Sequence, residues 1–490
     1  MTAMKATGAV SLPHCLGPSR AAARNGAIGL TSYGRLFPEL PAFEADESFL
    51  YALGRAGGLC DSATDDDEPA SLGTEAAGWP FFGQFVAHDI TADRSLPQAH
   101  VDPSSLRNAR SPQLNLECLY GDGPVGHPFL FQRNDPAKLL TSADGHDVQR
   151  NAEGVAIIGD PRNDSHALMS QMHLAFVHAH NGFVDRARGE GVPDADVFRT
   201  AARELRWHYQ TALLKEFLPS LIGPEAVAAL RREGRRFYHP DGQAYIPLEF
   251  ADAAYRYGHS QIRHRYCLNK TTTPVPIFPD LIGFRPISPE RCVDWTVLFD
   301  APGQPRAQRA KKIDGRLVRA LIALPVAVTG ECAIEELHSL AVRDLERGQG
   351  VGLPSGEAVA SYIGEMPLTA DEVGTARAGW NGETPLWYYI LREADIRCGG
   401  NRLGPVGMRI VGEVLIGLLD LDATSVRYAP PEWTPHATLV DLLTHRDANA
   451  VSTRDSGTVL SCPNVTSPIQ QSAADQQLRG ARNRPFQRCP

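Results

Sequence analysis

The stretch FFGQFVAHDITAD (Phe81–Asp93) places an imidazole and a carboxylate at the end of an apolar, aromatic run. Pro80 precedes the run, and proline suits the first turn of a helix because its missing N–H has no partner to lose there. On the short helix that this predicts, Gln84 and His88 share one side, whereas Asp89 is turned about 100° away. The neighbouring His88 and Asp89 are therefore expected to face different surroundings.

The composition is that of an ordinary soluble globular protein. Of the 490 residues, 43% are hydrophobic and 21% are charged, which allows a large core. The net charge of -9 argues against nucleic acid as a partner, which needs a basic face. Nine cysteines without a C-x-x-C pair fit a reducing compartment and argue against a zinc or iron–sulfur site. Neither a secretory signal nor a run of about 18 apolar residues is visible, so the expected location is the cytoplasm, with no membrane span.

Helical periodicity dominates the chain, and few alternating strand patterns occur. The sequence predicts a mainly α fold with few short strands, in one large domain over residues 31–445. An N-terminal extension (1–30) and a polar C-terminal extension (446–490) flank it. Helices are expected at Ala167–Arg188, Val197–Leu221, Glu249–Arg263, Cys332–Arg347, Thr384–Ala394 and Pro405–Leu419.

The segment GDPRNDSHALM places an arginine at the start of a helix. Asp160–Pro161 is expected to form a turn, and Asp164 or Ser165 is expected to cap the helix that follows. Arg162 lies in that turn. It is a candidate functional residue at the mouth of the helix, and the simpler alternative is an ion pair with Asp160 or Asp164.

The segment EFADAAYRYGHSQIRHRY (Glu249–Tyr266) combines a face of small residues with a cation and an imidazole. Small residues let a bulky flat object approach closely, and Arg256 lies one turn before His259 on the same side. Taken singly, His88 and His259 are more often core histidines than ligands. Three further histidines recur at seven-residue spacing, nearly two helical turns and too far apart for one ion, and are predicted to be structural: His166, His173 and His180.

The order and wording of several segments together resemble the animal-type haem peroxidase superfamily, specifically its bacterial branch. The resemblance runs from about Tyr33 to His445, and the segments that carry it read FFGQFVAHDIT, GDPRNDSHALMSQMHLAFVHAHN, AAYRYGHSQIR, LAVRDLERGQGVGLPSG and LWYYILREADIRCGGNRLGPVGMRIVGEVLIGLL. The resemblance implies a mainly helical, single-domain fold around one buried b-type haem. It also implies a haem-dependent peroxidase that uses hydrogen peroxide to oxidise a small organic donor, aromatic or phenolic, through a ferryl intermediate.

By position in these motifs, the resemblance assigns five residues to the two sides of the haem. His88 is implied as the distal histidine, Arg162 as the distal arginine and Gln84 as a distal hydrogen-bonding residue. His259 is implied as the proximal iron ligand and Arg256 as the partner of a haem propionate. A neutral imidazole can move a proton between the peroxide oxygens, and a fixed guanidinium stabilises the developing charge.

Asp344, in LAVRDLERG, falls where the family usually has an asparagine that bonds the second ring nitrogen of the proximal histidine. A carboxylate there makes His259 more electron-donating, because outer-shell acceptors raise the basicity of a metal-bound imidazole. The simpler alternative is a surface ion pair with Arg343 or Arg347.

A calcium site is also implied by the resemblance. Asp89 corresponds to a calcium ligand in many relatives, and the loop SPQLNLECLYG would complete the site with the oxygen ligands that calcium needs. Relatives commonly carry aspartate at the two last side-chain positions, where this chain has Asn115 and the longer Glu117. The candidate calcium ligands are Asp89, Ser111, the Gln113 carbonyl, Asn115 and Glu117.

The chain departs from relatives that bind haem covalently. Mammalian members form ester bonds from an aspartate before the distal histidine and a glutamate after the distal arginine, and here those positions are Ala87 and Ser165. Neither residue offers a carboxylate. Haem b is therefore expected to be held non-covalently, and the halide oxidation of the ester-linked enzymes is put in doubt.

Other functions remain open from the sequence. A fatty-acid dioxygenase of the same superfamily needs a tyrosine near the haem on the proximal side, and Tyr255 and Tyr257 are close to His259 in sequence. A specialised biosynthetic oxidase is a further alternative. A metal-dependent His-Asp phosphohydrolase leaves Arg162 unexplained, and a non-enzymatic haem-binding or interaction protein is the remaining class. Substrate contacts are expected in loops such as Thr91–Asn108.

Overall fold

The described residues of the computed structural model lie within one compact unit, Met1–Arg454. They are residues 31–63, 68–92 and 106–444. The predicted N-terminal and C-terminal extensions lie outside the described residues, and so does most of the loop Thr91–Asn108.

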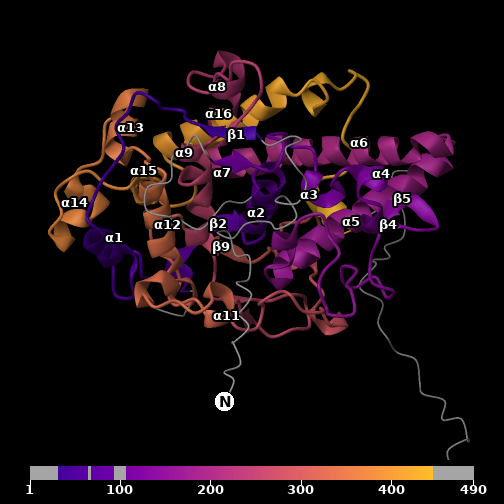
Figure 1. Ribbon diagram of the computed structural model, residues 1–490, viewed down its shortest axis with the longest axis horizontal. Helices are drawn as coiled ribbons and strands as arrows, with labels where there is room; N and C mark the ends of the chain where they lie inside the picture. Colours follow the sequence, from indigo (N-terminus) through magenta and orange to yellow (C-terminus); the bar gives the residue numbers. More distant parts are fainter. Residues whose placement is uncertain (1–30, 64–67, 93–105, 445–490) are drawn as a thin grey trace, which may run out of the picture. The chain divides into compact units, whose positions relative to one another are not determined.

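Helices dominate the described part of the chain, which confirms the predicted mainly α fold (Figure 1). The longer α-helices are α1 (Glu47–Gly54), α2 (Trp79–Ile90), α5 (Ala167–Gly189), α6 (Asp194–Ala212), α8 (Pro224–Glu233), α12 (Leu340–Gly350), α13 (Gly356–Ile363), α15 (Leu386–Cys398) and α16 (Pro405–Leu421). The shorter ones are α3 (Glu117–Tyr120), α4 (Gly123–Gly126), α7 (Leu218–Ile222), α9 (Leu248–Ala251), α10 (Arg319–Ile322), α11 (Val326–Thr329), α14 (Ala370–Val373) and α17 (Leu439–Leu443).

The strands are short and join segments that are distant in sequence. β1 (Thr31–Gly34) lies between β3 (Arg107–Asn108), which is antiparallel to it, and β6 (Ile246–Pro247), which is parallel. The other strands form antiparallel pairs: β2 (Leu72–Ala76) with β9 (Arg309–Lys311), β4 (Phe131–Gln132) with β5 (Asp135–Leu139), and β7 (Arg265–Tyr266) with β8 (Val275–Pro276). The helices therefore provide most of the buried core.

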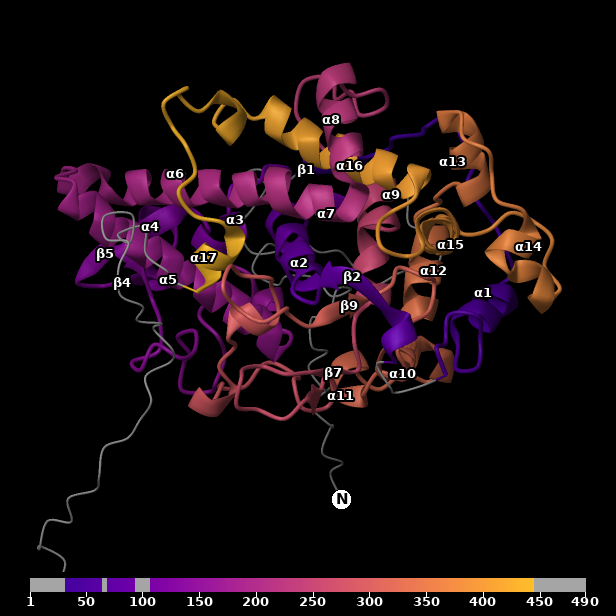
Figure 2. The same cartoon turned by 180° about the vertical axis from the view of Figure 1, so that it is seen from behind.

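Helix α2 is buried near the centre of the molecule, where it packs against α5, α3 and the segment Ala254–Gln261 (Figure 1 and Figure 2). Pro80 lies in its first turn, as the sequence predicts, and the helix ends where the Thr91 backbone N–H donates to the Ala87 carbonyl. Phe85 of α2 stacks on Phe176 of α5, with ring centroids 4.5 Å apart. Both rings are fully buried, and burying such a side chain contributes about 1.5–3 kcal/mol.

A long helical segment covers this core along α6. It continues from α6 through a π-helical turn, Leu213–Phe217, directly into α7. Phe217 in that turn packs edge-on against Phe82 of α2, with centroids 5.4 Å apart. The π-helical turn thus presents an aromatic side chain to α2.

The predicted continuous helix Glu249–Arg263 is wrong, because it is broken after α9. Asp252 is fully buried, and its carboxylate accepts from Arg347 Nε at 2.6 Å and Arg256 Nη2 at 3.2 Å. Ala253 then leaves the helical region, with φ -137° and ψ -77°. A 3₁₀ helix, η6 (Ala254–Gln261), follows. With about three residues per turn, η6 aligns residues three apart on one face.

Another predicted helix is shorter than expected. The predicted helix Cys332–Arg347 is a short 3₁₀ turn, Glu335–His338, followed by α12, where the Ser339 hydroxyl accepts from the Val342 backbone N–H of the first turn. In the part of the chain that the structure describes, no helix is long and apolar enough to cross a membrane.

Candidate active site

A cavity of about 1160 Å³, counted with its opening to solvent, lies between α2 and η6. From α2, Gln84, Ala87 and His88 line it, and from η6, Arg256 and His259 line it. The structure therefore brings together, around one space, residues that are about 170 positions apart in the chain. Arg162 and His166, from the turn before α5, line the same cavity.

His88 is held by a neutral hydrogen-bonded line. Its Nδ1 lies 2.8 Å from Asn163 Oδ1, and Asn163 Nδ2 lies 3.1 Å from His173 Nδ1. Because an amide oxygen only accepts, His88 Nδ1 carries the proton and donates it, which leaves Nε2 as the acceptor. Burial lowers the pKa of His173 to about 4, so His173 is a neutral acceptor for the Asn163 amide at pH 7. His88 is itself only 3% exposed.

Arg162 lines the cavity and also makes the ion pair that the sequence left as an alternative. Its Nη2 lies 2.7 Å from Asp160 Oδ2, and its Nε lies 3.0 Å from Asp160 Oδ1. The same Nη2 donates to the His88 carbonyl at 3.1 Å. Burial acts to raise the pKa of Asp160, but the cations Arg162 and Arg110 outweigh it and hold that pKa well below its usual range. Asp160 therefore stays ionised and fixes the guanidinium beside His88.

Gln84 and His166 pair with each other at the edge of the cavity. Gln84 Oε1 lies 3.0 Å from His166 Nε2, so the imidazole donates and the amide accepts. His166 was predicted to be structural only, and the structure corrects this because the residue lines the cavity. The predicted caps Asp164 and Ser165 are also wrong: His166 occupies the position before α5, and the Asp164 carboxylate pairs with Arg150 at 2.7 Å.

His259 is held by a carboxylate. Its Nδ1 lies 2.5 Å from Asp344 Oδ2, the contact that the sequence motif implies. Asp344 is fully buried on α12. Burial acts to raise the pKa of Asp344, but His259 and Arg256 outweigh it and lower that pKa. With Nδ1 committed to a carboxylate, Nε2 is the ring nitrogen suited to a metal.

Arg256 has protein partners in this structure. Its Nη1 donates to Asp344 Oδ1 at 2.9 Å, and its Nη2 donates to Asp252 Oδ1 at 3.2 Å. Arg347, the other partner considered for Asp344, pairs with Asp252 instead. The sequence-based role of Arg256 as the partner of a haem propionate stays a prediction, and its visible role is to hold Asp344 in place.

The residues around the cavity fit a metal that is coordinated by a macrocycle and by one protein ligand. In the described ranges, no group of three or more His, Cys, Asp or Glu side chains can hold a bare ion. His259 is a single imidazole with the carboxylate partner typical of metal-bound histidine. Beside His259, the wall formed by η6 leaves open space, since a Cβ added at Gly258 would meet no atom within 4 Å. A planar haem with one protein ligand matches this arrangement, whereas the His-Asp phosphohydrolase alternative lacks a ligand cluster.

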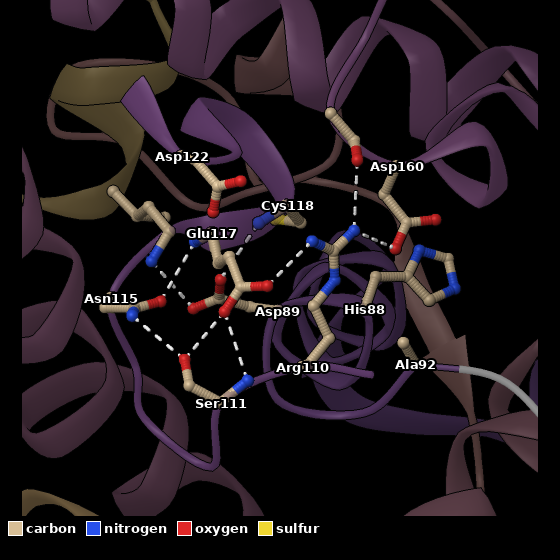
Figure 3. A network of polar contacts seen from close by, with 12 residues as sticks. His88, Asp89, Ala92, Arg110, Ser111, Asn115, Glu117, Cys118, Asp122 and Asp160 are labelled. Carbon is tan, nitrogen blue, oxygen red and sulfur yellow. Dashed lines mark hydrogen bonds and ion pairs between the residues drawn. The ribbon is translucent and has the colours of Figure 1, made fainter. Parts of the chain in front are cut away.

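The candidate calcium ligands do gather between Asp89 of α2 and the loop of residues 111–117, but their oxygens are bonded within the protein (Figure 3). The Asp89 carboxylate accepts from the backbone N–H of Leu116 at 3.0 Å and of Cys118 at 3.3 Å. Burial raises the pKa of Asp89 to about 7, although these two backbone bonds act to lower it. Glu117 Oε1 lies 3.2 Å from Arg110 Nη1.

The rest of the loop is bonded in the same way. Glu117 Oε2 accepts from Ser111 Oγ at 2.7 Å, and Asn115 Oδ1 accepts from the Glu117 backbone N–H at 3.0 Å. Asn115 Nδ2 lies 3.4 Å from the side-chain oxygen of Gln113. The residues present therefore do not fit the calcium site that the sequence motif implies.

Two residues of this region were missed by the sequence analysis. Asn163 adjoins Arg162 in the GDPRND turn, so its position beside a candidate site was a usable signal. Arg110 carried no signal, because its partners Asp160 and Glu117 become neighbours only through folding.

Comparison with known proteins finds distant similarity to one family. Residues 98–280 match the family described as animal haem peroxidase. Over this part, the chain is similar to animal haem peroxidases. Among curated relatives, it is 25% identical over 253 residues to peroxidasin of Drosophila melanogaster, which covers 49% of this chain and 16% of that protein. It is 26% identical over 174 residues to the probable oxidoreductase PXDNL of Homo sapiens, which covers 35% of this chain and 11% of that protein.

Solved structures share this fold. Peroxidase A from Dictyostelium discoideum matches with a TM-score of 0.61 and 15% identity, covering 89% of this chain and 95% of that one. A fatty acid alpha-dioxygenase from Arabidopsis thaliana matches with a TM-score of 0.61 and 15% identity, covering 91% and 82%. At this identity the likeness concerns the fold alone. The curated peroxidases above are animal proteins, and the chain spans less than a third of the length of each. They give no support to the bacterial branch expected from the motifs.

Proposed function

We propose that this protein belongs to the animal haem peroxidase superfamily and is a peroxidase that binds haem b and uses hydrogen peroxide to oxidise a small organic donor, aromatic or phenolic. One observation carries the proposal: His88, held by a neutral amide, and His259, held by a buried carboxylate, line the same cavity. The first is suited to moving a proton and the second to binding a metal.

The residues of the chain divide the work between the two walls of the cavity. Haem, when bound, would supply the iron that reduces peroxide and then takes electrons from the donor. His259 offers Nε2 to the iron, with Asp344 fixing the tautomer and orientation of the ring. His88 Nε2 takes the proton from a peroxide in the cavity and returns it to the departing oxygen, which typically contributes about 10²–10⁴-fold in rate. Arg162, fixed by Asp160, stabilises the negative charge that develops on that oxygen.

The haem is proposed to be held without covalent bonds. Ala87 lines the cavity next to His88 and has no group that can form an ester. Ser165 is buried, and its hydroxyl has no hydrogen-bond partner within the described residues, but it has no carboxylate either. Acid–acetone should therefore extract the haem completely, and haem that stays with the protein would contradict this part of the proposal.

A fatty-acid dioxygenase is the second candidate, because one tyrosine is placed for it. Tyr255 lines the cavity and is buried, and its hydroxyl has no hydrogen-bond partner in the described part of the chain. Its ring stacks on Phe250, with centroids 4.5 Å apart. A hydroxyl in that position is available to lose a hydrogen atom to an oxidised cofactor. The peroxidase is preferred because His88 and Arg162 give peroxide cleavage both a base and a cation.

The deciding experiment compares two reactions of the haem-loaded protein. With hydrogen peroxide and a simple phenol, we expect oxidation that falls about 10²–10⁴-fold in His88→Ala, and little change in Tyr255→Phe. His127→Ala is the matched control, since this histidine is partly exposed and pairs with Asp122. Oxygen uptake with a long-chain fatty acid, abolished by Tyr255→Phe, combined with no phenol oxidation, would reject the peroxidase in favour of the dioxygenase.

A further inference from the structure

We propose that Arg110 supplies the positive charge that joins the loop of residues 110–118 to the turn of Arg162, so that the fold requires no divalent cation at this position. The inference concerns how α2 is tied to its surroundings. It does not depend on haem binding or on peroxidase activity, because every contact behind it is made by the protein itself.

Arg110 lies between two carboxylates that belong to different segments (Figure 3). Its Nη1 lies 3.2 Å from Glu117 Oε1, in the loop, and its Nη2 lies 2.7 Å from Asp160 Oδ2, in the turn. Nη2 also donates to the Gly159 carbonyl at 3.0 Å. One guanidinium therefore bridges two segments that are about 40 residues apart, with three hydrogen bonds.

The bridge is buried and strongly charged. Arg110 is 9% exposed and Asp160 is 1% exposed. Burial acts to lower the pKa of Arg110, but Asp160 and Glu117 outweigh it and raise that pKa above its usual value. A charged pair removed from water is retained only where geometry and further hydrogen bonds compensate the lost solvation, and the Gly159 carbonyl provides one such bond.

The same bridge leads to the cavity through Asp160. Asp160 Oδ2 accepts from both Arg110 and Arg162, each at 2.7 Å. The shared carboxylate thus lies between two arginines, one facing the loop and one lining the cavity. Arg110 offsets part of the negative charge of Asp160. It also fixes the position of Asp160 relative to the loop, through Glu117.

The oxygens of the loop leave little room for an ion. Calcium requires about six to eight oxygen ligands, and the Asp89 carboxylate is already filled by the backbone N–H groups of Leu116 and Cys118. Leu116 adopts φ 63° and ψ 34°, the left-handed conformation, at the point where its N–H faces Asp89. An ion at this place would have to displace these donors and Arg110 as well.

The first experiment uses the wild-type protein as purified. Elemental analysis should find less than about 0.1 calcium per chain, since the carboxylates are satisfied by Arg110 and backbone donors. The thermal midpoint of unfolding should be the same in about 1 mM calcium chloride and in about 5 mM EGTA. The first condition fills a calcium site of about millimolar or tighter affinity, and the second empties it. Stoichiometric calcium, or a midpoint that falls in EGTA, would overturn the proposal.

The second experiment removes the charge and keeps the volume. Breaking a buried ion pair is strongly destabilising, so Arg110→Met should lower the thermal midpoint by about 3–6 °C in a domain of this size. Arg107→Met is the matched control, because Arg107 lies in the same segment and is exposed, and we expect its midpoint to stay within about 1 °C of wild type. Equal midpoints for the two variants would show that Arg110 does not carry the bridge. If Arg110→Met does not fold, the calcium measurements on the wild type still decide the question.

Discussion

His88 and His259 line opposite walls of the cavity, and they differ in the group that pairs with Nδ1. His88 donates to the amide oxygen of Asn163, at 2.8 Å, whereas His259 lies 2.5 Å from the carboxylate of Asp344. An amide orients the ring without adding charge, whereas a carboxylate also draws on the Nδ1 proton and makes Nε2 a better electron donor. The comparison teaches that the group bonded to Nδ1, behind the ring, suits one imidazole to proton transfer and the other to metal binding.

Removing His259 tests the metal-binding wall and has the largest expected effect. Loss of an outer-shell partner costs about 10–100-fold in metal affinity, so loss of the ligand itself in His259→Ala should weaken haem binding by more than about 100-fold. The measurement is titration of the Soret absorption band. His88→Ala, on the other wall, should bind haem almost as the wild type does. Equal haem affinity in His259→Ala and wild type would show that His259 is not the ligand.

Neutralising Asp344 tests what its charge adds. In Asp344→Asn the ring nitrogen keeps an acceptor but loses the charge, so haem affinity should fall by about 10-fold and the reduction potential of the bound iron should rise. Asp252→Asn is the matched control, because Asp252 also bonds Arg256 and is equally buried. A potential that shifts equally in both variants would mean that the charge acts through Arg256 and not through His259.

The reverse exchange tests the other wall. In Asn163→Asp a carboxylate faces His88 Nδ1, and an opposite charge at hydrogen-bond distance favours the protonated imidazole. A protonated imidazole cannot take the proton from the peroxide. The rate of the peroxide reaction at pH 6 should fall by about 10-fold and recover at higher pH. Asn151→Asp, at an exposed turn, is the control, and superimposable pH profiles for wild type and Asn163→Asp would refute the role of Asn163.

How far the sequence predicts this molecule depends on where the deciding contacts lie. Helix α2 could be predicted from Pro80 and its aromatic run, because both act within one segment. The break at Asp252 could not, because Arg347, 95 residues away, forms the ion pair that anchors it. Nothing in the local pattern disfavours a continuous helix there.

The same distinction applies to the site. The contact between His259 and Asp344 was predicted because a motif fixes both positions, and the structure shows it. The calcium ligands were also assigned by motif, yet Arg110 lies among them, and no local pattern relates this arginine to Asp160. Residues whose partners come from other segments are those that sequence reasoning misses.

The smallest expected effect concerns His173, which keeps the line behind His88 neutral. Burial lowers its pKa from 6.5 to about 4, while the charge of Asp160 acts to raise it. Below pH 6.5 the unfolded chain binds a proton that the folded chain refuses, so the stability from this residue is full above pH 6.5 and declines as pH falls toward 4. Between pH 7.5 and pH 6 the loss is about 1 kcal/mol. His173→Gln should lack this part of the decline in the free energy of unfolding, measured by urea denaturation at the two pH values. The matched variant His127→Gln should decline as the wild type does. If the free energy of unfolding of His173→Gln declines as much as that of the wild type, His173 accepts a proton in the folded protein. The hydrogen-bonded line behind His88 would then not be neutral.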